Sequence, residues 1–127
     1  MQFWTRRTIA TDTADAWDLL TDLDRWPEWG PSLTAAELDA PGRFVTGATG
    51  RMRTSIGVSL PFELTHVVDG ERWSWDVGGV TATSHAIEPS ADGVRVSFGV
   101  PVWAPPYLAV CAVALRRIET LLTSGRR

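Results

Sequence analysis

The 127-residue sequence predicts a single α+β domain, residues 1–127, built on an antiparallel sheet of about seven strands. Three observations predict this fold class. A strand-like segment at the N-terminus leads into a short helix, turn signals divide residues 33–102 into six strand-like runs, and residues 107–124 have a helical pattern. Short turns between consecutive strands favour antiparallel pairing, so the six runs are expected to form a meander.

The N-terminal strand is expected at residues 2–10 and the helix from there to about Asp22. A cluster of capping residues at positions 11–13 marks the start of the helix. Asp15 then lies in the first turn, where the helix dipole favours a negative charge. A strand followed by a capped helix is therefore the predicted beginning of the domain.

Three indoles follow within a short stretch, at Trp17, Trp26 and Trp29. The last two belong to the segment 26–31, WPEWGP, in which two prolines restrict the backbone. Large rings on a restrained backbone are typical of the wall or mouth of a cavity, and a helical turn is compatible with this loop. Trp17 is expected to face the sheet together with Leu20 and to belong to the core.

The strongest hairpin signal is Asp69-Gly70 between two strand-like runs. A two-residue turn there pairs Val68 with Glu71 and places apolar residues on one face of the sheet. Glu63 and Asp76 then form a solvated pair on the opposite face. The further pairs predicted on the apolar face are His66 with Trp73, Leu64 with Trp75, and Phe62 with Val77.

The next turn, at residues 78–80, is ambiguous. A two-residue turn would expose Ile87, whereas a three-residue turn sends Thr83, His85 and Ile87 inward, so the three-residue turn is preferred. The turn at residues 90–93 then aligns His85 with Phe98 and Ile87 with Val96. Two rows of side chains are predicted across the strands: His66, Trp73, His85 and Phe98 in one, and Leu64, Trp75, Thr83 and Val100 in the other.

The C-terminal helix is expected after Pro105 and Pro106, in accordance with proline in a first turn. Residues 107–115 are apolar on every side, whereas residues 116–124 are amphipathic. An apolar half-helix needs cover on both sides. We expect a partner such as a second copy of the chain over Val110 and Val113, or the Trp-Pro loop folded over them.

Composition excludes several functions. A net charge of −3 argues against nucleic-acid binding, which needs a basic patch. All 12 basic residues are arginine, so lysine Schiff-base chemistry is excluded. The single cysteine, Cys111, cannot form an internal disulfide, which favours a reducing compartment. With no signal-peptide pattern and no apolar run long enough for a bilayer of about 30 Å, a cytoplasmic protein without a transmembrane segment is expected.

Several of these segments together resemble one family. Trp17-x-x-Leu20-x-Asp22 followed by the Trp-Pro segment, Trp73-Ser74-Trp75, and His85-x-Ile87-x-Pro89 are similar to the SRPBCC/START superfamily, in particular its polyketide cyclase/dehydrase-like branch. The resemblance covers nearly the whole chain. It implies a helix-grip fold, in which a curved antiparallel sheet grips a long C-terminal helix around a cavity, with a short helical segment after the first strand. It implies no universal catalytic residue.

The ligand-binding candidates are the side chains expected to face that cavity. Aromatic rings such as Trp73 can stack on a planar ligand, and Tyr107 can donate a hydrogen bond from the C-terminal helix. Arg51 and Arg53 alternate with Met52 and are expected in solvent if Met52 faces inward. The candidates are Trp29, Met52, Leu64, His66, Trp73, Trp75, Thr83, His85, Phe98, Val100, Tyr107 and Cys111.

His66, His85 and Tyr107 are the candidate proton-transfer groups, since cyclase or dehydratase chemistry moves protons. A metal shared by the two histidines is not expected, because they lie two strands apart, roughly 10 Å. Neither a metal nor an organic cofactor is predicted.

Three functions remain open. The first is binding of a hydrophobic, aromatic or polyketide-like small molecule in the cavity. The second is a polyketide aromatase/cyclase or dehydratase that uses the same cavity, with His or Tyr moving protons. The third is a partner-binding protein that docks through its apolar C-terminal helix.

Overall fold

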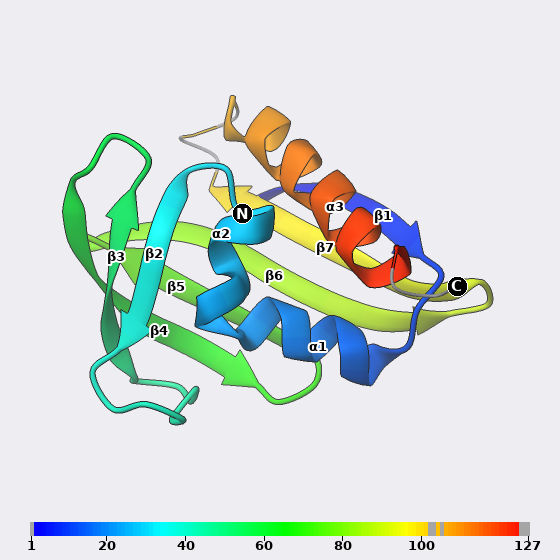
Figure 1. Ribbon diagram of the computed structural model, residues 1–127, viewed down its shortest axis with the longest axis horizontal. Coiled ribbons are helices and arrows are strands. Elements are labelled where there is room, and N and C mark those ends of the chain that lie inside the picture. The colour runs from blue at the N-terminus through cyan, green and yellow to red at the C-terminus, as the bar shows by residue number, and fades with distance from the viewer. Residues whose placement is uncertain (1, 102–103, 105, 125–127) are drawn as a thin grey trace.

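The computed structural model describes residues 2–101, 104 and 106–124. It contains one seven-stranded antiparallel sheet with the strand order β1-β7-β6-β5-β4-β3-β2 (Figure 1). The strands are β1 (Gln2–Ile9), β2 (Leu33–Leu38), β3 (Thr49–Thr54), β4 (Ser59–Val68), β5 (Arg72–Val77), β6 (Val80–Ser90) and β7 (Gly93–Pro101). The helices are α1 (Thr13–Thr21), α2 (Trp26–Trp29) and α3 (Tyr107–Thr123), with a 3₁₀ turn, η1 (Leu23–Arg25), before α2. The predicted α+β helix-grip fold is confirmed.

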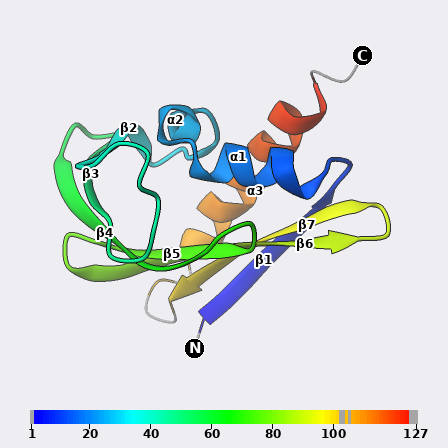
Figure 2. The same ribbon diagram turned by 90° about the horizontal axis from the view of Figure 1, so that it is seen from below.

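All three helices lie on one face of the sheet, and the sheet curls around them (Figure 2). The strands β2 to β7 form the predicted meander, and β1 pairs with β7 at one edge of the sheet. Helix α3 packs against β1 and β7, and the ion pair from Arg7 to Glu119, 2.7 Å, adds a polar link between β1 and α3. Pro105, predicted to precede this helix, lies outside the described residues, as does Val102.

Helix α1 begins as its sequence predicts. The side chain of Asp12 accepts a hydrogen bond from the backbone N–H of Asp15, 2.8 Å, and caps the helix. Trp17 differs from the expectation, because it is half-buried at the edge of the core. Its indole N–H donates to Asp69 in the β4–β5 turn, 3.1 Å away, so this residue ties α1 to a hairpin.

The β4–β5 hairpin contains a register shift that the sequence does not predict. The turn leaves three residues between Val68 and Arg72, so Val67 pairs with Trp73 and His66 pairs with Ser74. A bulge between Leu64 and His66 then restores the predicted pairs Leu64–Trp75 and Phe62–Val77. The predicted two-residue turn with its Val68–Glu71 pair and the predicted His66–Trp73 pair are therefore wrong. His66 is exposed on the outer face of the sheet, away from the helices.

In the β5–β6 hairpin the predicted turn is wrong, but the residues predicted to point inward do so. Its turn is the two-residue type, Gly78-Gly79, with φ of 60° and 81°, so the three-residue turn is wrong. A bulge opposite Trp75 adds one residue to β6 and turns Thr83 and His85 inward, as predicted. The pairs His85–Phe98 and Ile87–Val96 between β6 and β7 are confirmed.

The core lies between the sheet and the helices. It is unusually aromatic, because residues of the Trp-Pro segment enter it together with inward side chains of β4 to β7. Among its largest fully buried side chains are Trp26, Trp73, Phe98, Ile9, Leu19, Leu20, Leu64, Leu115 and Ile118. No helix among the described residues is long and apolar enough to cross a membrane.

Candidate ligand-binding site

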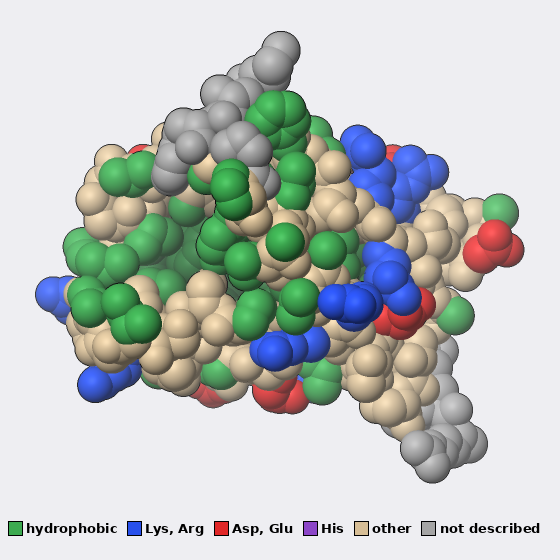
Figure 3. Space-filling model, turned by 90° about the horizontal axis from the view of Figure 1, so that it is seen from above, with side chains coloured by type: hydrophobic (Ala, Val, Ile, Leu, Met, Phe, Trp, Pro, Cys, Tyr) green, Lys and Arg blue, Asp and Glu red, His purple; other side chains and the backbone are tan. Residues whose placement is uncertain are grey.

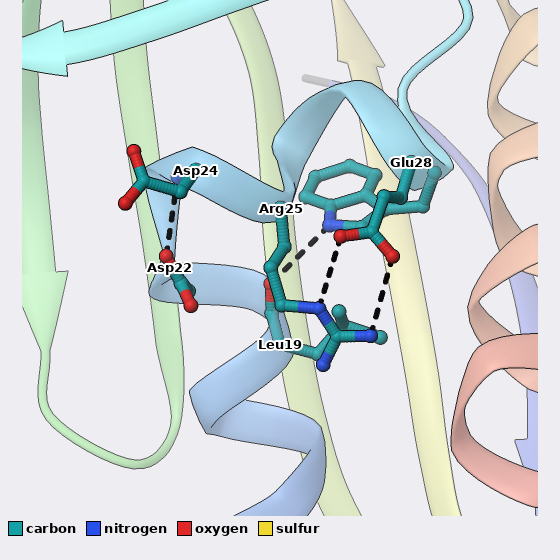
Figure 4. Close-up of polar contacts among 6 residues, drawn as sticks. Leu19, Asp22, Asp24, Arg25 and Glu28 are labelled. Atoms are coloured by element: carbon teal, nitrogen blue, oxygen red, sulfur yellow. Dashed lines mark hydrogen bonds and ion pairs between the residues drawn. The ribbon is translucent and has the colours of Figure 1, made fainter. Parts of the chain in front are cut away.

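The Trp-Pro segment is held by a series of local hydrogen bonds (Figure 4). The side chain of Asp22 accepts from the backbone N–H of Asp24, 3.1 Å, and caps η1. Arg25 forms an ion pair with Glu28 across α2, 3.2 Å. Both indoles of the segment are then fixed to the end of α1, because Trp26 donates to the carbonyl oxygen of Leu20, 2.9 Å, and Trp29 donates to that of Leu19, 3.2 Å.

These bonds place Trp26 and Trp29 in a cluster of aromatic rings above the sheet. Trp26 stacks on Trp73 with ring centroids 5.1 Å apart and planes within 5° of parallel. Trp73 also stacks on His85, at 3.8 Å and 26°. Phe98 meets the His85 ring edge to face at 4.7 Å. The Trp-Pro segment thus packs directly on the row predicted across β5, β6 and β7.

A chain of hydrogen bonds crosses this cluster. The indole N–H of Trp75 donates to the Thr83 hydroxyl oxygen, 3.0 Å, and that hydroxyl lies 2.9 Å from Nε2 of His85. Nδ1 of His85 lies 3.3 Å from the carbonyl oxygen of Trp73, which can only accept. His85 is therefore protonated at Nδ1, and Nε2 accepts the hydrogen of the Thr83 hydroxyl. Both ring nitrogens are occupied by the protein itself.

The surroundings of His85 also determine its charge. Burial lowers the pKa of His85 from 6.5 to about 3, and the hydrogen bond to the Trp73 carbonyl opposes this shift only in part. The imidazole is therefore neutral at neutral pH. A base with such a low pKa, with both nitrogens engaged, is poorly suited to accept a proton from a substrate.

The aromatic rings leave only a small inner cavity. Its volume is about 40 Å³, which is room for no more than a few water molecules. Helix α3 and the Trp-Pro segment enclose it from above, and the sheet forms its floor. The lining residues are Trp26, Trp29, Gly30, Pro31, Ser32, Leu33, Trp73, Trp75, Thr83, His85, Phe98, Tyr107, Val110, Cys111 and Ala114.

A larger outer groove, of about 290 Å³, lies beside the inner cavity. It opens where the ends of β3, β4, β5 and β6 approach the start of α3, and Figure 3 shows hydrophobic side chains gathered around a hollow on this side of the molecule. None of its described lining residues carries a charge. They are Ser32, Met52, Thr54, Leu60, Trp75, Val77, Val80, Thr81, Ala82, Thr83, Val100, Pro101, Ala104 and Tyr107.

Four residues line both spaces and form the boundary between them: Ser32, Trp75, Thr83 and Tyr107. The hydroxyl oxygens of Ser32 and Tyr107 lie 2.5 Å apart, a short hydrogen bond that joins the residue after the Trp-Pro segment to the first turn of α3. Burial raises the pKa of the Tyr107 phenol, and the hydrogen bond to Ser32 opposes this shift. The phenol is therefore neutral at neutral pH.

The structure distributes the predicted ligand-binding residues between these spaces. Met52 and Val100 line the outer groove, and Trp29, Trp73, His85, Phe98 and Cys111 line the inner cavity. Burial raises the pKa of the Cys111 thiol to about 11, so this side chain is an apolar part of the wall. Leu64 is buried in the core but lines neither space, and His66 lies on the outer face.

Other residues of the site were missed by the sequence prediction. The groove includes Leu60, the strand residues Val77 and Val80 on either side of the β5–β6 turn, and Ala104 before α3. Their contribution depends on where strand ends meet, which no local sequence signal gives. Ser32 follows the Trp-Pro segment directly, and this position next to a predicted cavity wall is the one signal that could have identified it.

Charged residues near the sheet lie outside both spaces. Arg51 and Arg53 are exposed, as their alternation with Met52 predicts. Glu63 pairs with Asp76 on the outer face. Within the described part of the chain, no group of three or more His, Cys, Asp or Glu side chains is arranged to hold a metal ion.

The apolar half of α3 is partly covered from within the molecule, since Cys111, Ala114 and Leu115 are buried whereas Val110 is half-buried. Helix α2 contacts α3, and Val110 lines the inner cavity together with Trp29 and Gly30 of the Trp-Pro segment. Val113 is half-buried. The Trp-Pro segment is thus one predicted cover that the structure shows beside Val110, and a second copy of the chain over Val113 stays a prediction.

The fold and these two adjoining spaces define a helix-grip domain with an apolar groove. The chain belongs to the family described as polyketide cyclase/dehydrase and lipid transport, whose profile matches residues 2–123. None of the curated proteins is significantly similar to it.

Solved structures share the fold at low sequence identity. Protein MLL2253 from Mesorhizobium loti has a TM-score of 0.79 at 14% identity, with 100% of each chain covered. The Aha1 dimer from Colwellia psychrerythraea has a TM-score of 0.71 at 20% identity, covering 100% of this chain and 99% of that one. DynU16, from the dynemicin biosynthetic locus, has a TM-score of 0.73 at 20% identity, covering 98% of this chain and 48% of that one. At these identities the likeness concerns the fold alone.

Proposed function

We propose that this protein binds a neutral, apolar small molecule in the outer groove. The observation that carries the proposal is the combination of volume and lining: about 290 Å³ of space bounded by apolar side chains and a few hydroxyl groups, with no charge among the described lining residues. Small-molecule sites are of this kind, mostly apolar with a small number of polar groups that fix orientation. The volume is near the lower end for such sites, which favours a small ligand.

The family supports the same class of ligand. Its description includes polyketides and lipids, and one structural neighbour, DynU16, comes from the dynemicin biosynthetic locus. Trp75 lies at the inner end of the groove, where a flat ligand can contact its ring. An aromatic or polyketide-like ligand is therefore the specific form of the proposal.

A cyclase or dehydratase that uses histidine is less well supported. His66 is on the far side of the sheet, and both nitrogens of His85 are occupied within the aromatic cluster. Tyr107 is the one of the three candidate proton-transfer groups that lines the groove. Burial raises the pKa of this phenol and so disfavours its deprotonation, and a hydrogen bond to a bound ligand is therefore preferred over proton transfer.

The proposal can be tested with N-phenyl-1-naphthylamine, a neutral dye that fluoresces in apolar sites. We expect saturable binding to the wild type. Ala82→Phe places a ring in the groove and should weaken binding at least about tenfold, because ligand and ring compete for one volume. Ala86→Phe is the matched control, since Ala86 is on the same strand but on the outer face.

The control variant should bind the dye as the wild type does, and circular dichroism should show both variants folded. Absence of saturable binding to the wild type, or equal binding by Ala82→Phe, would contradict a ligand site in this groove. Native mass spectrometry of the purified protein gives a second readout, because a co-purifying small molecule should be retained by Ala86→Phe and lost from Ala82→Phe.

A further inference from the structure

The boundary between the two spaces holds a hydrogen-bond donor that the protein does not use. The hydroxyls of Ser32 and Tyr107 form one hydrogen bond with each other, in which either can be the donor. Each hydroxyl carries one hydrogen, and their mutual bond uses only one of the two. Whichever group donates, one O–H hydrogen of the pair is left for an acceptor outside the pair.

A second unused donor belongs to Trp73, a residue that lines the same inner cavity. Trp73 is almost completely buried, and its indole N–H donates to no described residue. Buried N–H groups without an acceptor are rare in folded proteins, because burial removes their hydrogen bonds to water. The ring faces of Trp73 pack against Trp26 and His85, so its position is fixed whether or not an acceptor is present.

The other polar hydrogens of the described nitrogen and oxygen side chains around the inner cavity are engaged. Trp26 and Trp29 donate to backbone carbonyls of α1, Trp75 donates to Thr83, and His85 is bonded at both nitrogens. Donors are therefore in excess beside the cavity. An inner space of about 40 Å³ is too small for a ring but large enough for a single oxygen.

We propose that the ligand of the outer groove is a neutral apolar molecule with a carbonyl oxygen at its edge, and that this oxygen enters the inner cavity. There it accepts a hydrogen bond from the Ser32–Tyr107 pair, in the cavity that Trp73 also lines. The apolar body of the ligand remains in the outer groove against Met52 and Trp75. This inference rests on the proposed function, because it requires a ligand in that groove.

A matched pair of probes tests it. 9-Fluorenone and fluorene have the same three-ring outline and differ in a carbonyl group against a methylene group. Wild type should bind fluorenone about threefold to tenfold more tightly than fluorene, the ratio expected for one neutral hydrogen bond. The C=O stretching band of bound fluorenone should lie at a lower frequency than in hexane, since a hydrogen bond weakens the carbonyl bond.

The double variant Ser32→Ala/Tyr107→Phe removes both hydroxyls of the boundary pair. It should bind fluorene as the wild type does, lose most of the preference for fluorenone, and move the carbonyl band toward its position in hexane. The matched control is Ser74→Ala/Ser84→Ala, which removes a hydrogen-bonded hydroxyl pair from the outer face and should keep both the preference and the band shift.

The outcomes separate this inference from the proposed function. If both probes bind the wild type equally and the carbonyl band is unshifted, the carbonyl site is wrong while binding in the groove stands. If neither probe binds, the proposed function itself fails and this inference fails with it. Both results come from the wild type, so they do not depend on how well the double variant folds.

Discussion

His85 illustrates how the surroundings of one residue change its chemistry. Histidine is the side chain most often used for proton transfer near neutral pH, and the sequence alone makes His85 a catalytic candidate. In the structure its ring is stacked on Trp73, and its nitrogens bond to Thr83 and to a backbone carbonyl. The same contacts that fix the ring remove its capacity to act as a base at neutral pH.

The lowered pKa of His85 predicts a pH dependence of stability. Below pH 6.5 the unfolded chain takes up a proton at this residue, whereas the folded protein does so only near pH 3. The free energy of unfolding should therefore fall as the pH decreases through this window, by at most roughly 1.4 kcal/mol per pH unit from this residue. Above pH 6.5 the neutral ring is favoured in both states and the contribution is constant.

Urea unfolding of wild type and His85→Gln, repeated at about every pH unit between pH 4 and pH 7.5, measures this contribution. The difference in stability between the two proteins should shrink as the pH falls, because the variant has no imidazole to protonate. His66→Gln is the matched control, since that side chain is exposed on the outer face. A constant difference between wild type and His85→Gln across the range would contradict a buried neutral imidazole.

At the scale of elements, the strands and the β6–β7 register are predictable from the sequence, whereas the bulges that shift the register in β4 and β6 are not. The alternation of Val94, Val96 and Phe98 identified β7 and its inward face, and the hairpin signals identified the turns. Each of the two bulges adds a residue, and no local preference marks the strand position that receives it. In β6 the bulge adds the residue by which the turn is shorter than predicted, so His85 points inward as expected. In β4 the bulge leaves His66 pointing outward.

The candidate site was predictable to a similar extent. The inward rows followed from amphipathic alternation, and so Trp73, Trp75 and Thr83 were found. The division into a filled inner part and an open outer groove depends on how far Trp26 and Trp29 enter the sheet's concave face. That depth is set by their hydrogen bonds to the end of α1, which are tertiary contacts that periodicity does not report.

The β5–β6 turn gives a prediction at this scale. Gly79 has φ of 81°, and a Cβ added there would meet no atom within 4 Å, so a substitution tests backbone strain without a clash. Gly79→Val should lower the free energy of unfolding by about 1–2 kcal/mol, because a β-branched residue resists positive φ. Gly79→Asn should cost less, since asparagine tolerates this conformation.

Thermal or urea unfolding of the two Gly79 variants measures both costs. An equal loss for valine and asparagine would show that the turn had changed its type. In that case the adjoining groove residues Val77 and Val80 would also be displaced, and dye binding would change together with stability.

At the scale of the whole molecule, one ring links the layers of the fold. Trp26 is fully buried and contacts aromatic rings from the loop before β3 and from β4 and β5. It also donates its N–H to α1. The short α2 helix is therefore joined to the sheet and to α1 through this side chain. We expect α2, which covers the site, to unfold together with the sheet beneath it.

Trp26→Ala tests this coupling. Removing a fully buried indole leaves a large cavity and should lower the free energy of unfolding by about 3–5 kcal/mol, a substantial part of the stability of a small domain. Trp4→Ala is the matched control, because Trp4 is 40% exposed and lies over Gly99 on the outer face. The control should lose much less. Urea unfolding followed by far-ultraviolet circular dichroism gives both values.

The cavity in Trp26→Ala has a further consequence. It would be lined by aromatic rings and would adjoin the inner cavity, and apolar cavities of this kind bind small aromatic molecules. Indole should therefore raise the melting temperature of Trp26→Ala by binding the folded state in the new cavity, and by more than it raises that of wild type and Trp4→Ala, which offer it only the outer groove. If the three proteins gain equally from indole, α2 collapses onto the sheet when the Trp26 ring is removed, and the Trp-Pro segment is not a rigid cover of the site.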